Sequence, residues 1–268
     1  MSETKPTNFS VYLAEFLGTF IFLLCGIGCV AAMVLNKSSF SQWDLSITWG
    51  MAVTMGVYIC AAMSGAHLNP SVTVALAIYG CFDKKKILPY IVAQMLAGFL
   101  AAAVAYFLYY DLFKIALEAA GSDPAAKTSL VGIFCTFPQK NVSILQAFFT
   151  ELVITGILMS LIMALTDDGN GVPRGAMAPL LIGIVVALIG ASFGPLTGFA
   201  MNAARDFGPR MFAVVAGWGT DALTGYPISA VNKTIPYFLV PLIAPIVGAL
   251  LGAKTYTVVI GKKLVCSI

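Results

Sequence analysis

Five ionisable side chains lie inside long apolar stretches of this sequence, and they are the first candidates for chemistry. They are Glu15, His67, Glu151, Arg205 and Asp206, in a chain of 268 residues of which 59% are hydrophobic and only 10% charged. An arginine or aspartate at the centre of a bilayer costs roughly 2.5–3.5 kcal/mol on insertion scales. We therefore expect these groups to face the protein interior or water, where they would mark a solute or proton pathway.

Two asparagines stand directly before short apolar stretches, Asn69 in HLNPSVT and Asn202 in MNAARDF. Asparagine is among the best helix N-caps, and proline suits the first helical turn. Each asparagine is therefore expected to begin a short helix, with Pro70 or Ala203 at its first position. A helix N-terminus carries a positive potential of about half a charge. Where two such ends converge, a cation or proton meets a barrier that a neutral molecule does not, and the asparagine amides can donate to a passing oxygen.

The residues before each asparagine are expected to be extended, because each short helix begins only at the asparagine. Non-helical backbone at membrane depth survives only where it is buried in protein or lines water. A line of carbonyl acceptors along a pathway is expected from Gly65, Ala66, His67, Leu68, Gly198, Phe199 and Ala200. Arg205 adds a guanidinium with several donors, so the lining suits a neutral solute with hydroxyl groups. The alternative for Arg205 is a salt bridge with Asp206, but adjacent helical residues point about 100° apart, which favours the pathway.

Glu15 and Glu151 occupy matched places in the two halves of the chain, in AEFLGT and TELVITG. One interpretation makes them proton carriers. The favoured one makes them buried acceptors that bond the N–H groups of the extended segments and support those loops, and Asp206 is grouped with them as loop-supporting. His67, the sole histidine, is interpreted as a core residue rather than a metal ligand, since no second ligand is spaced near it. The six cysteines form no metal pattern, and we expect no metal or other cofactor.

Apolar runs of more than 18 residues dominate the chain and predict an all-α membrane protein. A soluble domain carries roughly 25% charged residues, so the composition excludes an ordinary soluble enzyme, a nucleic-acid binder and a disordered protein. A lipid-facing β-barrel would instead show alternating segments of about ten residues. About 20 apolar residues cross a bilayer, which predicts six spans: Val11 to Leu35, Leu45 to Met63, Ile87 to Tyr109, Ile144 to Leu165, Met177 to Phe193 and Ile235 to Ile260. Two stretches are too short to cross and are predicted as re-entrant half-helices, Pro70 to Tyr79 and Ala203 to Val215.

The two halves of the chain repeat the same order of elements, roughly over residues 11–110 and 144–260 of a single domain, 1–268. Each half has three spans, so the second enters the membrane from the opposite side and the repeats are inverted. Paired short segments in such repeats point to the permeation or binding site. Lysines 84–86 and the positive charges near both termini fall on one side, which predicts cytoplasmic termini. Arg210 is counted among the loop cations of the other side.

Three motifs make the chain similar to a known family: AEFLGT, SGAHLNPSVT and TGFAMNAARDFGP. They resemble the major intrinsic proteins, the aquaporins, over nearly the whole chain, and LTDDGNGVPRG resembles the glycerol-conducting branch. The resemblance implies a homotetramer in a bacterial inner membrane, with one pore per subunit and a filter of Trp49, Gly190, Phe199 and Arg205. It implies a passive channel that conducts glycerol, similar polyols and water and excludes ions and protons. Urea is a further candidate solute. Neither enzymatic activity nor a nucleic-acid partner is expected.

The triplet Asn-Pro-Ala of that family is altered in both halves, to Asn69-Pro70-Ser71 and to Asn202-Ala203-Ala204. Both asparagine donors remain, and we hypothesise that Ser71 fills the space a second proline ring would take. The nearest competing function is a water-selective channel, which Gly190 and Phe199 disfavour because a water filter should be tighter and more polar. A proton-coupled secondary transporter and a structural protein with a vestigial pore are also compatible with an inverted-repeat membrane protein.

Overall fold

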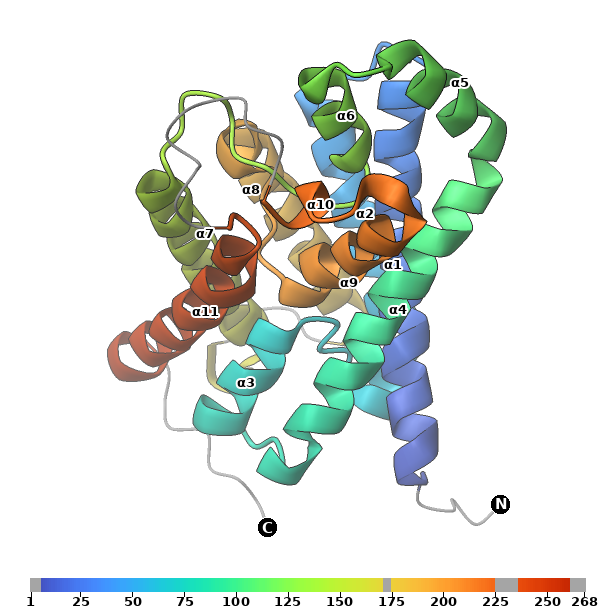
Figure 1. Cartoon of the computed structure of the whole chain (residues 1–268). Helices are drawn as coiled ribbons and strands as arrows, with labels where there is room; N and C mark the ends of the chain where they lie inside the picture. Colours follow the sequence, from blue (N-terminus) through green and yellow to red (C-terminus); the bar gives the residue numbers. More distant parts are fainter. Residues whose placement is uncertain (1–5, 171–174, 225–235, 261–268) are drawn as a thin grey trace.

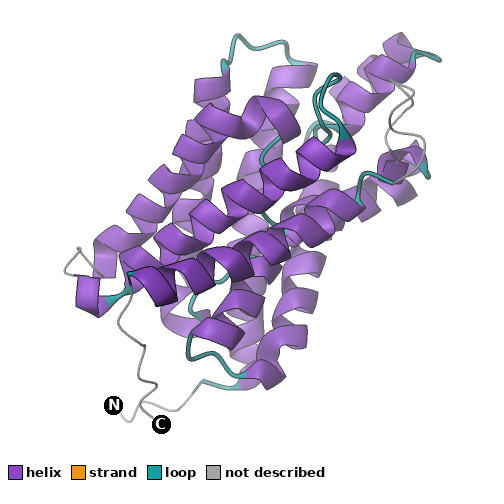
Figure 2. Ribbon diagram, turned by 90° about the vertical axis from the view of Figure 1, so that its left-hand side faces the viewer, coloured by secondary structure: helices purple, strands orange, loops and turns teal. Residues whose placement is uncertain are grey.

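The structure, a computed structural model, describes residues 6–170, 175–224 and 236–260, and within them it is built of helices without a strand. Six helices are long and apolar enough to cross a membrane. They run roughly alongside one another in Figure 2. They are α1 (Asn8–Leu35), α2 (Gln42–Ser64), α4 (Ile87–Leu108), α7 (Ile144–Thr166), α8 (Ala178–Thr197) and α11 (Leu239–Val259).

The six predicted spans are confirmed, and their ends differ by a few residues. Polar caps outside the apolar runs extend two of the helices. Thr7 accepts a hydrogen bond from the Ser10 N–H at the start of α1, and Ser41 forms a capping box with Asp44 at the start of α2. Helix α8 continues four residues beyond the predicted end at Phe193, to Thr197. The predicted start of the last span, Ile235, lies outside the described residues.

Two short helices, α3 (Pro70–Tyr79) and α9 (Ala203–Ala213), pack between α4 and α11, as Figure 1 shows. Both begin at the predicted residue, and the missing proline at Ala203 does not prevent α9 from forming. Helix α9 ends two residues before the predicted Val215, where it widens into a π-helical turn, Val214–Trp218. Gly217 closes that turn with φ 115°, a conformation that favours glycine.

Close helix crossings at glycine pairs hold the bundle together. Gly50 of α2 faces the backbone of Gly183 in α8, and Gly252 of α11 faces that of Gly156 in α7. A methyl group at either position would collide with the opposite backbone. Small residues allow membrane helices to approach this closely, and dispersion contacts between them then favour association.

Two helices between α4 and α7 were not predicted, α5 (Tyr110–Ala120) and α6 (Pro124–Val131). Both are too short to cross a membrane, and α5 mixes charged and apolar residues, so the segment is easily mistaken for a long loop. Stacked rings anchor it: Phe113 of α5 lies 5.3 Å from Phe134, which in turn lies 5.5 Å from Trp218. Four short turns complete the described helices: α10 (Asp221–Thr224) and the 3-10 turns Lys84–Lys86, Asp168–Asn170 and Gly175–Met177.

Candidate functional site

The two segments that precede the half-helices have nearly the same unusual backbone. Gly65 and Gly198 both have φ 80°, and each is followed by a residue with positive φ, Ala66 (51°) or Phe199 (40°). Positive φ is uncommon for residues other than glycine. The pattern repeats once more at Leu68 (53°) and Met201 (51°). The segments are non-helical as predicted, but the expectation that they are extended is wrong: in each, three of the four residues before the asparagine have positive φ.

A buried glutamate holds each of these segments. Glu151 accepts hydrogen bonds from the N–H groups of Ala200 (2.9 Å) and Met201 (2.8 Å) and from the Thr197 hydroxyl (2.6 Å). Glu15 accepts bonds from the N–H groups of His67 (3.3 Å) and Leu68. Both carboxylates are fully buried. These contacts match the interpretation of the glutamates as acceptors for loop N–H groups, and every described partner is a donor fixed in the protein.

Gln94 is a polar residue at this site that was not predicted from the sequence. Its side-chain amide donates to Glu15 (2.7 Å) and to the Thr73 hydroxyl (3.1 Å) and is fully buried. A lone glutamine inside the apolar run of α4 was the available signal. His67 lies beside it, with Nδ1 3.1 Å from the Thr73 hydroxyl and its ring against Phe82 at 4.4 Å. The described residues contain no group of three or more side chains suited to a metal.

The two asparagines cap their half-helices and also join the two halves of the chain. Asn69 Oδ1 accepts from the Ser71 N–H, and Asn202 Oδ1 accepts from those of Ala204 and Arg205. Asn69 Nδ2 donates to the carbonyl of Met201, and Asn202 Nδ2 donates to that of Leu68, both at 2.8 Å. Each amide carries a second hydrogen that these bonds do not use. The N-termini of α3 and α9 therefore face one another inside the bundle.

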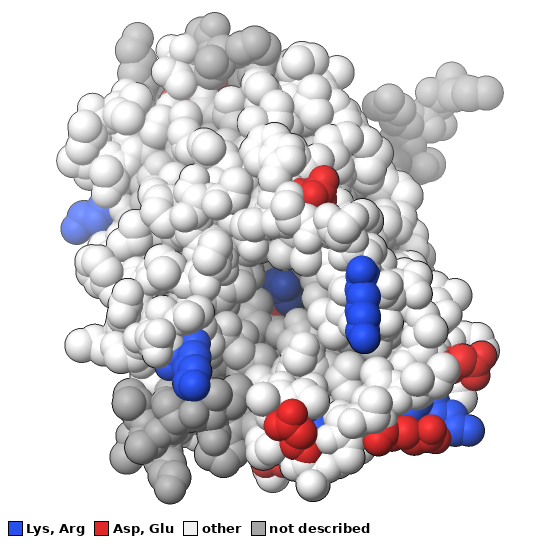
Figure 3. All heavy atoms as spheres, turned by 90° about the horizontal axis from the view of Figure 1, so that it is seen from above, with Lys and Arg blue, Asp and Glu red and all other residues white. Residues whose placement is uncertain are grey.

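Two cavities enter the molecule from opposite ends, and one of them, the inner cavity, reaches both asparagines. The inner cavity, of about 390 Å³, is lined by loop residues and both asparagines and by apolar side chains of the long helices and of α3. The outer cavity, of about 470 Å³, opens beneath α6, and Figure 3 shows the central hollow with basic atoms at its floor. Three residues line both cavities: Trp49, Phe199 and Arg205. The cavities therefore meet at these three side chains.

All the residues whose carbonyls were predicted to line a pathway lie on a cavity wall. The inner cavity is lined by Gly65, Ala66, His67, Leu68, Phe199 and Ala200, whereas Gly198 lines the outer one. The sequence did not indicate that the Leu68 carbonyl already accepts a bond from Asn202. Met201, which was not among the predicted residues, also lines the inner cavity.

The three shared side chains form two apolar walls and one cationic wall. The rings of Trp49 and Phe199 have centroids 6.4 Å apart and meet edge to face at 81°. The guanidinium of Arg205 lies 4.2 Å over the Trp49 ring and donates through Nη1 to the Phe134 carbonyl (3.3 Å). This one described hydrogen bond of the guanidinium leaves further N–H groups available at the junction.

Gly190, which the resemblance assigns to the filter, lies behind the Phe199 ring. It does not appear among the described residues that line the two cavities. A methyl group at Gly190 would lie 3.0 Å from the edge of the Phe199 ring and 2.9 Å from the Ser46 hydroxyl. The absent side chain thus makes room for Phe199 and not for open space in the cavity.

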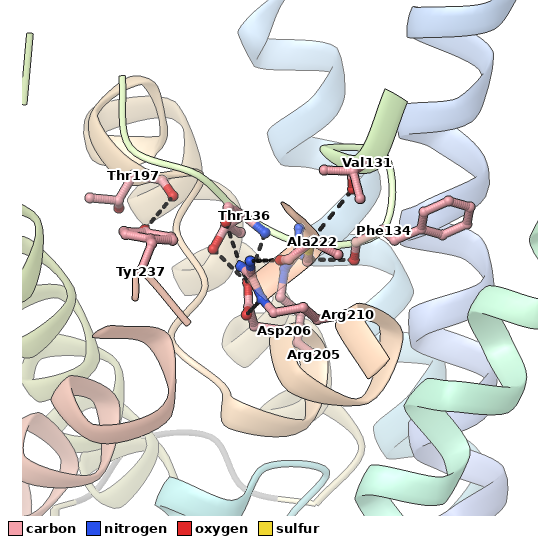
Figure 4. Close-up of polar contacts among 10 residues, drawn as sticks. Val131, Phe134, Thr136, Thr197, Arg205, Asp206, Arg210, Ala222 and Tyr237 are labelled. Carbon is pink, nitrogen blue, oxygen red and sulfur yellow. Dashed lines mark hydrogen bonds and ion pairs between the residues drawn. The ribbon is translucent and has the colours of Figure 1, made fainter. Parts of the chain in front are cut away.

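Asp206 pairs with Arg210, so the expected alternative of a salt bridge between Asp206 and Arg205 is wrong. The two side chains are fully buried and joined by bonds of 2.8 and 3.0 Å. Figure 4 shows how Asp206 also accepts from the N–H and hydroxyl of Thr136, both at 2.7 Å, while Arg210 donates to the Thr136 carbonyl. The buried pair therefore fixes the loop that carries the Phe134 carbonyl.

Arg210 is not the loop cation that the sequence predicted. Its charge is buried in the second half-helix, and the signal that could have shown this is its spacing of four residues from Asp206, which places both on one helix face. Burial raises the pKa of the nearby Cys135 thiol to about 12, and the thiol therefore stays uncharged.

Six spans, two half-helices whose N-termini meet inside the bundle, and a cavity from each end define an inverted-repeat, multi-pass membrane protein. A family model described as major intrinsic protein matches residues 2–256. The chain belongs to the major intrinsic protein family.

Relatives and a solved structure agree with this assignment. The chain is 54% identical to the glycerol uptake facilitator protein of Escherichia coli (strain K12), over 100% of this chain and 94% of that one. It is 52% identical to the propanediol uptake facilitator PduF of Citrobacter freundii, over 95% of this chain and 93% of that one. The X-ray structure of the aquaglyceroporin from Plasmodium falciparum superposes with a TM-score of 0.80 at 33% identity, over 93% of this chain and 96% of that one.

Proposed function

We propose that this protein is a passive channel for glycerol and similar small neutral polyols, and that water and urea also pass. The observation that carries the proposal is the meeting of the two cavities at Trp49, Phe199 and Arg205. A polyol has carbon on one side and hydroxyls on the other. The junction offers two aromatic walls and one guanidinium, which match those two sides. The relatives named for uptake of glycerol and propanediol support the same solute class.

In this proposal Trp49, Phe199 and Arg205 form the selectivity filter, with Gly190 acting from behind Phe199. The Arg205 N–H groups bind neighbouring hydroxyl oxygens, and the aromatic rings contact the carbon backbone. Farther in, the loop carbonyls accept hydrogen bonds while the opposite wall stays apolar. That wall is made of Val53, Val57, Val72, Leu76, Leu158, Ile162, Ile182 and Val186. A solute can then exchange its water for protein acceptors without meeting a deep binding site.

Ion and proton exclusion are assigned to the junction of the half-helices. The N-termini of α3 and α9 each contribute about half a positive charge, and Arg205 adds a full one. The free amide hydrogens of Asn69 and Asn202 orient a passing oxygen as an acceptor. Glu15, Glu151 and Asp206 support the loops and take no part in transport. The protein is therefore a pore and not an enzyme.

The proposal places the channel as a homotetramer in the plasma membrane of a bacterium, with both termini in the cytoplasm. The even number of spans puts the two ends of the chain on one side. The lysine triplet Lys84–Lys86 lies at that end of α4, as the positive-inside rule requires for a cytoplasmic face. The inner cavity then opens to the cytoplasm and the outer one to the other side.

Stopped-flow light scattering on proteoliposomes tests the proposal, with separate sucrose and glycerol gradients. Rapid re-swelling in glycerol with a low activation energy is the expected result, and protein-free vesicles are the control. Trp49→Ala and Phe199→Ala should each loosen the selection among polyols by removing an apolar wall. Unchanged polyol permeability ratios in both variants would refute the filter assignment but not the proposed channel function.

The two competing functions give different results in the same vesicles. A water-selective channel would show fast water flux without glycerol flux. A proton-coupled transporter would accumulate glycerol against its gradient when a pH difference is imposed. The described contacts of Glu15 and Glu151 disfavour the second, because fixed donors already surround both carboxylates.

A further inference from the structure

The two aromatic rings of the filter rest on glycines of the helices behind them. The six-membered part of the Trp49 ring faces Gly26 of α1, where a methyl group would lie 2.5–2.6 Å from three of its carbons. The Phe199 ring spans one turn of α8, and a methyl group at Gly194 would lie 2.8 Å from its Cδ1. Real side chains do not approach this closely, so any side chain at either glycine displaces a ring.

We infer that Gly26 and Gly194 are specificity-determining positions of the channel, although Gly26 lines neither described cavity. The inference rests on the proposed filter of Trp49, Phe199 and Arg205. The two glycines act as positioning residues: each lets a ring sit back against a helix, and together they set the width of the filter.

The surroundings of Trp49 determine the direction in which its ring moves. Phe22 lies edge to face with it at 6.5 Å, Phe199 at 6.4 Å, and Arg205 covers one face at 4.2 Å. Gly26 lies on the α1 side, and the described space without protein atoms is that of the cavities the ring lines. Because packed interiors yield little, a methyl group at Gly26 pushes the ring into the passage.

Phe199 is held in the same way, with one addition. A methyl group at Gly194 would also lie 2.5 Å from Nε2 of Gln42, the amide that donates to the Gly190 carbonyl at 2.8 Å. Phe199 therefore sits in a shallow groove formed by Gly190 and Gly194, closed at one end by Gln42. A side chain at Gly194 displaces the ring, the amide or both, and all these atoms lie at the outer cavity.

The chain provides a matched control for Gly26, two residues along the same helix. Gly28 has no atom within 4 Å of the position its Cβ would take. Gly26→Ala and Gly28→Ala add the same methyl group and the same gain in helix propensity. They differ in whether that methyl group meets the filter.

The experiment compares glycerol and water permeability in vesicles with equal amounts of wild-type, Gly26→Ala and Gly28→Ala protein. One methylene in a snug pocket changes discrimination by roughly 10-fold or more. We expect Gly26→Ala to lower glycerol permeability by about tenfold, and water permeability much less. Gly28→Ala should match the wild type in both. A wild-type ratio of glycerol to water permeability in Gly26→Ala would overturn the inference.

Double variants separate ring displacement from general damage. Trp49→Phe replaces the indole by a smaller ring without the atoms that face Gly26, so adding it to Gly26→Ala should raise glycerol permeability, although in the wild-type background it only reduces a filter ring. Phe199→Leu should likewise rescue Gly194→Ala. If Gly26→Ala does not fold, the Gly194 pair decides, and absence of rescue there would refute the inference. Failure of the proposed function is distinct, because wild-type vesicles would then pass no glycerol.

Discussion

Residues 65–79 enter the bundle from one end and residues 198–213 from the other. The two segments have nearly the same backbone conformation, but they differ in charge. Glycine and asparagine occur at the same places in both, each segment is held by a buried glutamate of a long helix, and the φ angles of Asn69 and Asn202 are −157° and −156°. In the first segment the chemistry is neutral or nearly so, with His67 at the cavity wall. The second carries Arg205 and the buried pair of Asp206 and Arg210.

This difference shows that shape and electrostatics are set by separate groups. The shape follows from contacts that the two halves have in common, so it survives the loss of proline at Ala203. The charges occur in one half only: Arg205 lies where the two cavities meet, and the pair of Asp206 and Arg210 is buried behind it. Solute selection can therefore change through the second segment while the path of the backbone stays fixed.

The largest effect is expected from breaking the buried ion pair, which the first half lacks. Asp206→Ala leaves the Arg210 charge buried without its partner, and such a change costs about 3–5 kcal/mol. Thermal unfolding in detergent, followed by tryptophan fluorescence, measures the loss. Asp206→Ala combined with Arg210→Met removes both charges and should recover much of the stability. A single variant as stable as the wild type would mean that the pair does not hold the loop.

Each half of the chain has one buried glutamate, and neutralising either one should affect stability to a similar extent. Glu15→Gln and Glu151→Gln each replace one acceptor oxygen by an NH2 group that faces a donor, so at least one hydrogen bond is lost, at a cost of about 1.5–3 kcal/mol. The two melting temperatures should fall by similar amounts, with Thr150→Ala at a half-buried position of α7 as a control. Unchanged stability, together with a lost pH-driven accumulation of glycerol, would instead identify the glutamates as proton carriers.

Adding a negative charge at the junction should have unequal effects in the two halves. Asn69→Asp and Asn202→Asp keep a capping oxygen but oppose the helix potentials, which lowers the barrier to cations by about 1–2 kcal/mol. Arg205 follows Asn202 within one helical turn and offsets part of that change, so Asn69→Asp should leak more. Cation current across planar bilayers measures the difference, and equal currents would contradict the asymmetry.

The smallest effect is expected from making the altered triplets alike. Ala203→Pro suits the first position of α9, since Asn202 is already extended and none of the described hydrogen bonds uses the Ala203 N–H. Proline at a compatible position adds about 0.4–1 kcal/mol. Ser71 is fully buried with an unpartnered hydroxyl. If it fills the space of a second proline ring, Ala203→Pro should stabilise the protein only in combination with Ser71→Ala. Ala203→Pro stabilising alone would refute that hypothesis.

Much of the fold follows from the sequence because membrane spans and helix caps are local signals. The six apolar runs and the starts of α3 and α9 depend on composition and on Asn69 and Asn202 alone. Helices α5 and α6 were missed because their stability comes from rings contributed by distant segments, such as Phe134 and Trp218. The π-helical turn after α9 likewise depends on a single glycine, Gly217.

The site was predicted where a residue type implies its own role, and missed where a role depends on partners. Charged residues in apolar helices stand out, so Glu15, Glu151 and Arg205 were found. Arg210 and Gln94 were missed because only the fold brings them to Asp206 and Glu15. The contact between Gly190 and the Phe199 ring was not predicted, since a sequence does not show which side chain packs against a glycine.

The crossed bonds of the two asparagines also set an order of events during synthesis. The Asn69 amide and the Leu68 carbonyl find their partners only in residues 201 and 202, which leave the ribosome some 130 residues later. Until then these groups must stay hydrated, because unsatisfied polar groups cost several kcal/mol inside a membrane. The first half-helix is therefore locked in place only when the second half is inserted, and the pore matures in one late step.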